Sequence, residues 1–224
     1  MPDQLLCRGF TCLPYAEPSL PVWLELLAMS FSGLYGAAVA RSRNVPVAGT
    51  LFAGILTGLG GGIVRDVMLG LEPVAISGAA YLPAVLVASA IGALVFYRAV
   101  SAMTPNLLLH GVVFGLLISI GCQKALFHGV PAFSVIVCGV LTASAGGMAV
   151  DVLTGHRAAA FSQAHWTLTA LLLGSGVYFV ATTMANLYVA TVFATLVTAA
   201  LYVMSVTKNW PSPKWPGEGS DMSA

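Results

Sequence analysis

Long apolar runs separated by short polar links dominate the chain. Seven runs approach the roughly 20 residues that a helix needs to cross the hydrocarbon layer of a membrane. They are residues 20–40, 47–70, 79–97, 106–122, 131–153, 165–183 and 186–206. Hydrophobic residues make up 58% of the chain and charged residues only 8%, whereas roughly a quarter of a soluble domain is charged. The pattern predicts an all-α, polytopic membrane protein with seven transmembrane helices.

A shift of 85 residues aligns one half of the chain with the other. Residues 33–70 then lie over residues 118–155 without a gap, and 12 of the 38 positions are identical. The identical positions include a proline, an aspartate and a pair of glycines, which apolar composition alone would not align. Each copy holds three apolar runs, so the second copy enters the membrane from the opposite side. We therefore predict an inverted repeat, in which sites form near the membrane midplane.

The repeat divides the chain into five parts. They are an N-terminal extension (1–19), a first three-helix repeat (20–104), a second, inverted three-helix repeat (105–184), a seventh transmembrane helix (185–207) and a C-terminal tail (208–224) that we expect to be disordered. The extension lacks the pattern of a signal peptide. It carries Cys7 and Cys12, and the sequence leaves open whether they form a disulfide.

Basic residues gather in the links on one side of the predicted bundle. These are Arg41, Arg43, Arg98, Arg157, Lys208 and Lys214. Because cytoplasmic links carry the excess of basic residues, we expect the C-terminus in the cytoplasm and the N-terminus outside. No basic block suited to a row of nucleic acid phosphates is present. The lipid bilayer is thus an expected partner of the chain and nucleic acid is not.

The second apolar run contains the most unusual residues. Gly60, Gly61 and Gly62 fall inside it, and Arg65 and Asp66 follow in the same run. Charge in hydrocarbon is costly, so the two charged residues are expected to face the protein interior or a water-filled path. The alternative for Arg65 is a structural ion pair, or a side chain that reaches the headgroups. The glycines either allow close packing of helices or kink the helix and free carbonyls that line a path.

The fifth run repeats part of this pattern. It contains Gly146 and Gly147, followed by Asp151. Val150 stands where the first repeat has Arg65, so no basic residue precedes Asp151. An aspartate without a local partner attracts cations better than a paired one, and we expect Asp151 to do so.

Hydroxyl and basic side chains near the glycines are further candidates. Thr57, Thr142 and Ser144 precede the glycines, and each either bonds to a carbonyl of its own helix or lines a pore. Lys124 closes the fourth run, where it is either an interfacial anchor or a pore-facing residue. Near other span ends lie Glu25 and the two histidines His110 and His165, which we expect at the membrane interface.

The spans lack the side chains of an enzyme or a metal protein. No Ser/His, paired-Asp or His-cluster arrangement falls within them, which disfavours an intramembrane enzyme. The histidines have no partner at metal-ligand spacing. We therefore expect no catalytic residue, no cofactor and no fixed metal site.

The motif GGG-x-x-RD-x-x-x-G ending at Gly70, its echo GG-x-x-x-D-x-x-x-G ending at Gly155, and the three-plus-three-plus-one spans resemble the bacterial branch of the trimeric intracellular cation (TRIC) channel family. Some bacterial relatives carry a glycine-transporter label. The resemblance covers roughly residues 22–206. It implies a homotrimer in the bacterial plasma membrane, in which every protomer holds its own pore. Kinked helices two and five would line that pore with helices one and four, and it would pass monovalent cations, chiefly potassium.

Two functions follow from these observations. In a cation channel, the glycines and hydroxyls would line the path, and Arg65, Asp66, Asp151 and Lys124 would attract ions or control gating. The scarcity of other polar groups in the spans favours this function. The alternative is a secondary transporter of a small zwitterion such as glycine, for which Arg65 and Asp66 together would bind the carboxylate and the amine.

Overall fold

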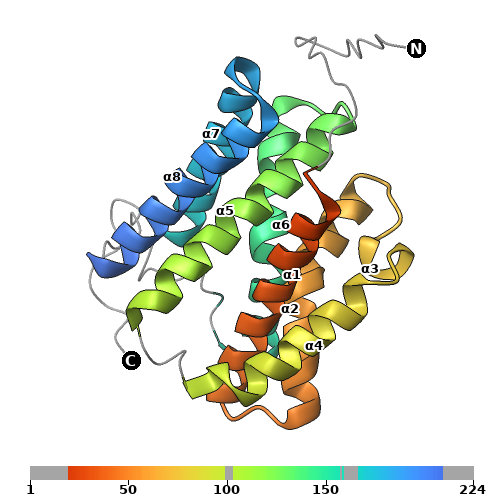
Figure 1. The fold of residues 1–224 in the computed structure, drawn as a ribbon, viewed down its shortest axis with the longest axis vertical. Coiled ribbons are helices and arrows are strands. Elements are labelled where there is room, and N and C mark those ends of the chain that lie inside the picture. Colours follow the sequence, from red (N-terminus) through yellow and green to blue (C-terminus); the bar gives the residue numbers. More distant parts are fainter. Residues whose placement is uncertain (1–19, 99–102, 157, 159–165, 209–224) are drawn as a thin grey trace, which may run out of the picture.

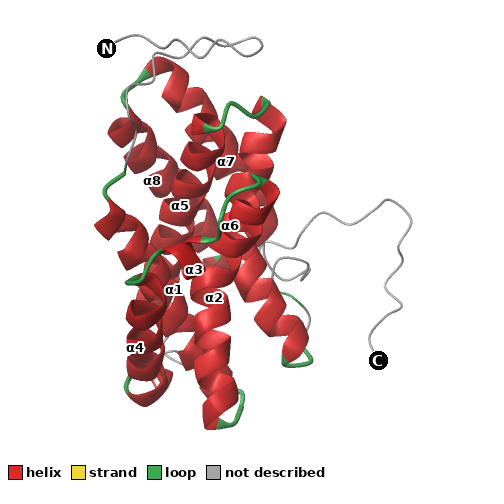
Figure 2. Ribbon diagram, turned by 90° about the vertical axis from the view of Figure 1, so that its right-hand side faces the viewer, coloured by secondary structure: helices red, strands yellow, loops and turns green. Residues whose placement is uncertain are grey.

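The computed structural model describes residues 20–98, 103–156, 158 and 166–208. The helices in chain order are α1 (Val22–Ser42), α2 (Val47–Met68), α3 (Val74–Ser77), α4 (Tyr81–Leu94), the 3-10 turn η1 (Phe96–Arg98), α5 (Met103–Phe127), α6 (Ala132–Leu153), α7 (Thr167–Met184) and α8 (Leu187–Thr207). They form one elongated bundle (Figure 1, Figure 2). The expected disulfide candidates Cys7 and Cys12, His165 and nearly all of the C-terminal tail lie outside the described residues.

Six helices of the described part are long and apolar enough to cross a membrane: α1, α2, α5, α6, α7 and α8. The chain is therefore a multi-pass membrane protein. The third predicted span differs, because α4 has only 14 residues and measures about 21 Å at 1.5 Å per residue. A hydrocarbon layer is about 30 Å thick. The rest of the predicted run 79–97 after α4 is the 3-10 turn η1. The chain before the run forms the short helix α3, which follows Pro73 and ends at Gly78, a residue with an extended backbone.

Four helices end in the same turn, and the four turns are related by the 85-residue shift. In each turn an N–H bonds to the carbonyl five residues earlier, which satisfies an otherwise free carbonyl. The bonds are Val45 to Ala40 and Val130 to Ala125, then Leu71 to Asp66 and His156 to Asp151. The residue before each N–H donor has a positive φ: Asn44 (60°), Gly129 (64°), Gly70 (70°) and Gly155 (74°).

The helices of the first repeat (α1, α2, α4) run opposite to the corresponding helices of the second repeat (α5, α6, α7), and the two repeats meet at α2 and α6. The chain runs down the view in α1 and α6, and up the view in α2 and α5 (Figure 1). Helix α1 packs on α2 and α4, α5 packs on α6, and α2 crosses α6. Helix α8 covers α5 and α7, with Gly111 and Gly115 of α5 close to Ala199 and Thr195 of α8. The last helix thus closes one side of the bundle.

Candidate functional site

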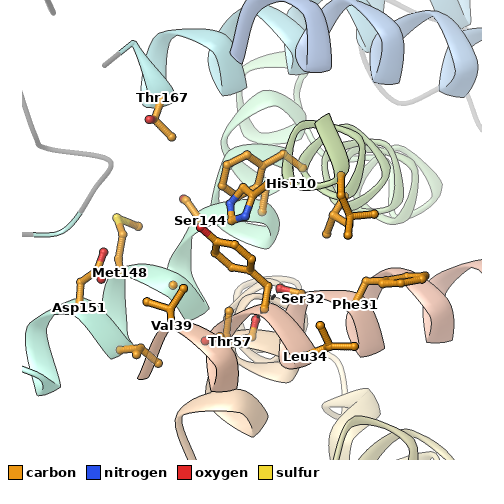
Figure 3. Close-up of a pocket in the computed structure, with 18 of the residues that line it drawn as sticks. Phe31, Ser32, Leu34, Val39, Thr57, His110, Ser144, Met148, Asp151 and Thr167 are labelled. Atoms are coloured by element: carbon orange, nitrogen blue, oxygen red, sulfur yellow. Dashed lines mark hydrogen bonds between the residues drawn. The ribbon is translucent and has the colours of Figure 1, made fainter. Parts of the chain in front are cut away.

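A cavity of about 170 Å³ lies in the half of the bundle toward the ends of α1 and α6. It lies between α1, α5 and α6, with single residues contributed by α2 (Thr57), η1, α7 and α8. Phe31 and Asp151 lie at opposite ends of it (Figure 3). Its lining includes Ser32, Tyr35, Arg43, Thr57, His110, Phe114, Ser144, Gly147, Asp151 and Tyr202.

Hydroxyl groups lie on the side of the cavity that faces α2 and α6. Thr57 Oγ1 donates to the Ala53 carbonyl at 2.8 Å, and Ser144 Oγ donates to the Val140 carbonyl at 2.7 Å. Ser32 Oγ reaches across to the Thr57 carbonyl at 3.2 Å. Thr57 and Ser144 donate their hydroxyl protons to carbonyls of their own helices. The lone pairs of their hydroxyl oxygens are therefore left to bind a cation.

Aromatic rings form another wall of the cavity. The His110 ring lies edge-on to Tyr35 and Phe114, with ring centroids 4.1 and 4.2 Å away. It is stacked on Tyr202 at 5.5 Å. His110 lines the cavity. It lies close to the start of the apolar span Leu107–Phe127, so its expected position near the membrane interface stays a prediction.

The cavity ends where α2 and α6 cross. A Cβ atom on Gly61 would strike the carbonyl of Thr142, and a Cβ atom on Gly146 would strike the carbonyls of Leu56 and Thr57. Gly60 lies beside Gly146 at the same point. Both helices are α-helical throughout, so no break occurs at the glycines in this structure. Their contact is close packing of backbones.

The remaining glycines and Thr142 have separate surroundings. Gly62 faces the methyl group of Met29, whereas nothing lies within 4 Å of a Cβ placed on Gly147, which lines the cavity. Thr142 donates to the Cys138 carbonyl at 2.6 Å and is buried against Gly121 and Gly61. Among the predicted hydroxyls, therefore, Thr57 and Ser144 line the cavity and Thr142 does not.

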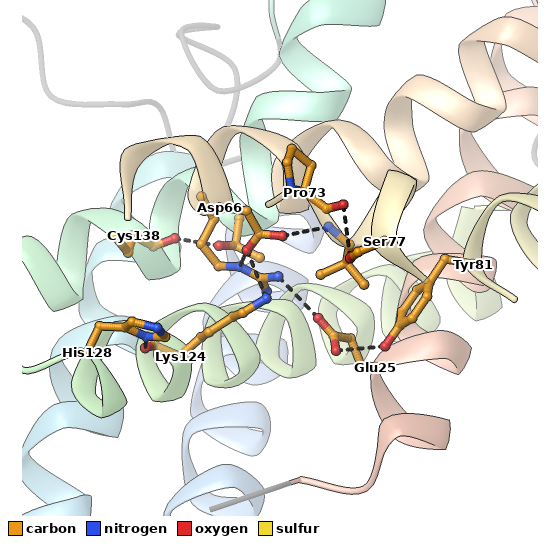
Figure 4. Close-up of polar contacts among 11 residues, drawn as sticks. Glu25, Asp66, Pro73, Ser77, Tyr81, Lys124, His128 and Cys138 are labelled. Carbon is orange, nitrogen blue, oxygen red and sulfur yellow. Dashed lines mark hydrogen bonds and ion pairs between the residues drawn. The ribbon is translucent and has the colours of Figure 1, made fainter. Parts of the chain in front are cut away.

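A cluster of four charged side chains lies beyond the crossing, in the opposite half of the bundle. Arg65 Nε donates to Asp66 Oδ1 at 2.8 Å, and Lys124 Nζ lies 2.9 Å from the same oxygen. Arg65 Nη2 donates to Glu25 Oε1 at 3.2 Å. Figure 4 shows these contacts. The structure thus brings Lys124 to Arg65 and Asp66, which the sequence had noted as adjacent charges in one run.

Asp66 also holds the short helix that precedes α4. Its Oδ2 accepts a hydrogen bond of 3.0 Å from the N–H of Val74, the first residue of α3. Tyr81 completes the cluster by donating to Glu25 Oε2 at 3.1 Å. Arg65 and Asp66 are completely buried, and buried charges are tolerated only when paired and hydrogen-bonded. Yet Arg65 Nη1 is buried with no hydrogen-bond partner among the described residues.

Asp151 has a partner that the local sequence did not reveal. Arg43 Nη1, at the end of α1, lies 2.8 Å from Asp151 Oδ1 and 3.1 Å from Thr154 Oγ1. The expectation of an unpaired Asp151 is therefore wrong. The sequence motif missed the pair because 108 residues separate the two side chains, and a search for local partners does not reach that far.

The comparisons with known proteins agree with this repeated architecture. The profile of a family described as Glycine transporter matches residues 22–99 and again residues 107–183. The chain belongs to this family, which is that of the TRIC channels. The two matches begin 85 residues apart, which is the shift found in the sequence.

Solved structures of TRIC channels have the same fold. A structure described under "Structural basis for conductance through TRIC cation channels" has a TM-score of 0.79 and 23% identity, covering 90% of this chain and all of the other. The TRIC trimeric intracellular cation channel orthologue from Rhodobacter sphaeroides has a TM-score of 0.74 and 26% identity, covering 84% and 97%. A prokaryotic TRIC channel in 0.5 M KCl has a TM-score of 0.72 and 19% identity, covering 84% of this chain and 96% of the other. No curated protein matches significantly.

Reasoning from the sequence did not assign four residues to the cavity or the charged cluster. Glu25 and Tyr81 complete the charged cluster, and Arg43 and His110 line the cavity. One signal was available for Glu25, because a carboxylate inside an apolar run calls for a partner. The described residues contain no group of three or more His, Cys, Asp and Glu placed to hold a metal ion.

Proposed function

We propose that the chain is a cation channel with a conduction path inside each protomer. The path would run from the cavity, past the crossing of α2 and α6, to the charged cluster around Asp66. The observation that carries the proposal is the position of the cavity. It lies between α1, α5 and α6, where Thr57 of α2 joins the lining. It ends near the crossing of α2 and α6, where Gly61 and Gly146 lie against main-chain atoms of the facing helix. Family membership and the likeness to the R. sphaeroides cation channel support it.

The described conformation corresponds to a closed channel in this proposal. The backbones of α2 and α6 touch at Gly61 and Gly146, which leaves no room for an ion at that contact. Opening requires the two helices to separate or rotate there. We propose that the glycines act as the pivot, because only a residue without a side chain permits sliding of two backbones in contact.

Lys124 is the proposed gating residue of the charged cluster. The cluster contains Glu25 and Asp66 as acids and Arg65 and Lys124 as bases, so its formal charges cancel. Lys124 is the most exposed of these side chains, at 28%, and it sits near the end of its helix. If Lys124 withdraws, two carboxylates face one guanidinium and the cluster attracts cations. A charge that crosses the whole membrane field gains about 2.3 kcal/mol per 100 mV, so voltage would bias this step.

Other properties come from the relatives and the sequence. We propose a homotrimer, since the R. sphaeroides orthologue is described as trimeric, and potassium as the main ion. The cluster would face the outside and the cavity the cytoplasm, in the bacterial plasma membrane. These assignments follow the distribution of basic residues, because Arg41, Arg43 and Lys208 lie at the cavity end of the bundle.

Recording in planar bilayers tests the proposed function. The purified protein is fused into a bilayer under a gradient of potassium chloride, with protein-free vesicles as the control. Discrete current steps that reverse near the potassium equilibrium potential are expected. Currents that reverse near the chloride potential, or folded protein that gives no current at any voltage, would contradict the proposal.

A carrier of glycine is the second candidate, and one observation favours it. Arg65 Nη1 is a buried donor without a partner among the described residues, and the carboxylates of Asp66 and Glu25 lie beside the same guanidinium. A guanidinium next to carboxylates suits the two ends of a zwitterion. Saturable uptake of radiolabelled glycine by proteoliposomes, lost in Arg65→Lys, would support the carrier. Uptake equal to that of empty liposomes would exclude it.

A further inference from the structure

The cavity and the charged cluster occupy corresponding places in the two repeats. Under the 85-residue shift each member of the cluster has a counterpart, and only the aspartate keeps its charged side chain. The counterparts are Asp151 for Asp66, His110 for Glu25, Val150 for Arg65 and Val39 for Lys124. All four counterparts line the cavity. The cavity therefore takes the place that charged side chains fill in the other half of the bundle.

Two of these replacements explain why space is left. Valine is far shorter than arginine or lysine. In the cluster, Arg65 is completely buried and its Nε donates to Asp66 Oδ1 at 2.8 Å, whereas Val150 has no group that could reach Asp151. Arg43 is one of the partners of Asp151, and it approaches from the end of α1. A cavity of about 170 Å³ remains beside the aspartate.

Arg43 offers this cavity a binding edge for a carboxylate. Within the described part of the chain, both of its hydrogen bonds use Nη1, one to Asp151 and one to Thr154. The N–H groups of Nε and Nη2 take no part in them. These two nitrogens form the fork that binds a carboxylate through two parallel hydrogen bonds. Arg43 is 24% exposed, so a ligand in the cavity can replace the water at this edge.

The other polar groups of the cavity suit an ammonium group. Asp151 carries a negative charge, and the hydroxyl oxygens of Ser144 and Thr57 have free lone pairs, because their protons go to helix carbonyls. The charges of Arg43 and Asp151 cancel. A ligand that is only an anion or only a cation would add an uncompensated charge to a partly buried site, which is costly. A zwitterion adds none.

The rest of the lining is aromatic and apolar. The rings of Tyr35, His110, Phe114 and Tyr202 form one wall, and Phe31 lies at the end opposite Asp151 (Figure 3). An apolar cavity of about 150 Å³ is large enough to hold benzene, so the volume here admits a ring. Glycine would leave this wall without a contact, and a larger side chain would cover it.

We propose that the cavity binds an α-amino acid with a ring-bearing apolar side chain. The carboxylate lies on Nε and Nη2 of Arg43, the ammonium lies between Asp151 and the Ser144 hydroxyl, and the side chain follows the aromatic wall toward Phe31. The ligand supplies the charges that the first repeat supplies with its own side chains. Only one consequence rests on the proposed function: in a channel, the ligand occupies the cavity end of the path and reduces the cation current.

Binding of radiolabelled L-phenylalanine to the purified protein in detergent tests the site without any current. Saturable binding is expected. Three unlabelled competitors each lack one part of the ligand: 2-phenylethylamine lacks the carboxylate, 3-phenylpropanoate lacks the ammonium and glycine lacks the ring. Each should compete about tenfold less well than phenylalanine, or worse. No saturable binding at millimolar concentration, or equal competition by 2-phenylethylamine, would overturn the proposal.

Three variants locate the ligand, and their unfolding midpoints show whether they are folded. Arg43→Gln should weaken phenylalanine binding about tenfold and leave 2-phenylethylamine binding nearly unchanged. Gly147→Leu should abolish binding of both, because Gly147 lines the cavity and nothing lies within 4 Å of its added Cβ atom. Arg41→Gln is the control, since that guanidinium bonds to the Ala93 carbonyl and lies over the ring of Tyr97 instead. Wild-type affinity in folded Gly147→Leu would place the ligand elsewhere and reject the site.

Recording in planar bilayers separates this site from the proposed function. Phenylalanine added on the side of the cavity should reduce the cation current of the wild type and leave that of Gly147→Leu unchanged. Saturable binding in a protein that gives no current would keep the site and reject the channel. Cation current from a protein that does not bind phenylalanine would keep the channel and reject the site.

Discussion

Gly61 of α2 lies directly against the main-chain carbonyl of Thr142 on α6. The equivalent contact joins Gly146 of α6 to the main chain of Thr57 on α2, so the two repeats make the same contact in both directions. At each of these two glycines, an added methyl group would overlap main-chain atoms of the facing helix. The separation of α2 and α6, and with it the end of the cavity, is therefore fixed by the absence of two side chains.

Replacing Gly61 by alanine should destabilise the protein. The new methyl group would strike the Thr142 carbonyl, which belongs to a helix backbone and cannot rotate away. Overpacking of this kind costs about 1–3 kcal/mol. The control is Gly147→Ala, where nothing lies within 4 Å of the added atom. Thermal unfolding in detergent should show a lower midpoint for Gly61→Ala alone; equal midpoints would mean that the helices separate freely at the crossing.

Removing the charge of Lys124 should favour the open channel. In Lys124→Gln the ammonium 2.9 Å from Asp66 is lost, and the cluster keeps two carboxylates against Arg65. We expect a higher open probability and a weaker dependence on voltage, because one fewer charge moves in the field. Lys124→Arg, which preserves the charge, is the control. A voltage dependence that stays the same in Lys124→Gln would remove this residue from gating.

Neutralising Asp66 should cost more stability than neutralising Asp151. Asp66→Asn leaves the completely buried Arg65 with Glu25 as its one carboxylate partner among the described residues. It also weakens the acceptor of the Val74 N–H. Loss of one partner of a buried pair costs about 3–5 kcal/mol. Asp151→Asn affects a partly exposed pair, worth about 1 kcal/mol or less.

Unfolding midpoints of the two Asn variants, measured side by side, decide this comparison. The double variant Asp66→Asn with Lys124→Gln should recover part of the lost stability, because it also removes the ammonium that Asp66→Asn leaves beside Arg65 without its carboxylate. If Asp66→Asn unfolds at the same temperature as Asp151→Asn, the cluster is more hydrated than its burial implies.

The turn that ends α5 should resist substitution for a conformational reason alone. Gly129 has a φ of 64° and nothing within 4 Å of an added Cβ atom, so Gly129→Ala should destabilise by about 1 kcal/mol through the left-handed conformation itself. Gly176 of α7 has equally open surroundings but an ordinary helical backbone. Gly176→Ala should be neutral or stabilising by up to about 1 kcal/mol. Thermal unfolding of both variants tests the difference, and a neutral Gly129→Ala would contradict it.

The apolar pattern predicted most of the helices because membrane spanning is a property of local sequence. Each of the six long helices lies close to a predicted run, since a span must satisfy its own backbone and expose apolar side chains to lipid. The third run, 79–97, corresponds to α4 and η1 together, and the apolar pattern could not show that its α-helical part is only 14 residues long. Nor could it show that the residues before this run form α3, whose first N–H bonds to Asp66, eight residues earlier in the chain.

The site was predicted in part. The sequence selected Arg65, Asp66, Lys124 and Asp151 as unusual, because charge in an apolar run is conspicuous by itself. It did not pair Lys124 with Asp66 or Arg43 with Asp151. It also left open whether the glycines allow close packing of helices or kink them, and the structure shows close packing at Gly61 and Gly146. Their action as a pivot remains a prediction.

The sequence by itself determined the membrane class, the approximate spans and the 85-residue repeat, because each of these depends on composition and order along the chain. Only the tertiary structure decided which charges neutralise one another. Coulomb attraction depends on distance in space, and the inverted repeat brings together side chains that are 58 and 108 residues apart, Asp66 with Lys124 and Arg43 with Asp151. A local motif records each charge, but the crossing of the two repeats supplies its partner.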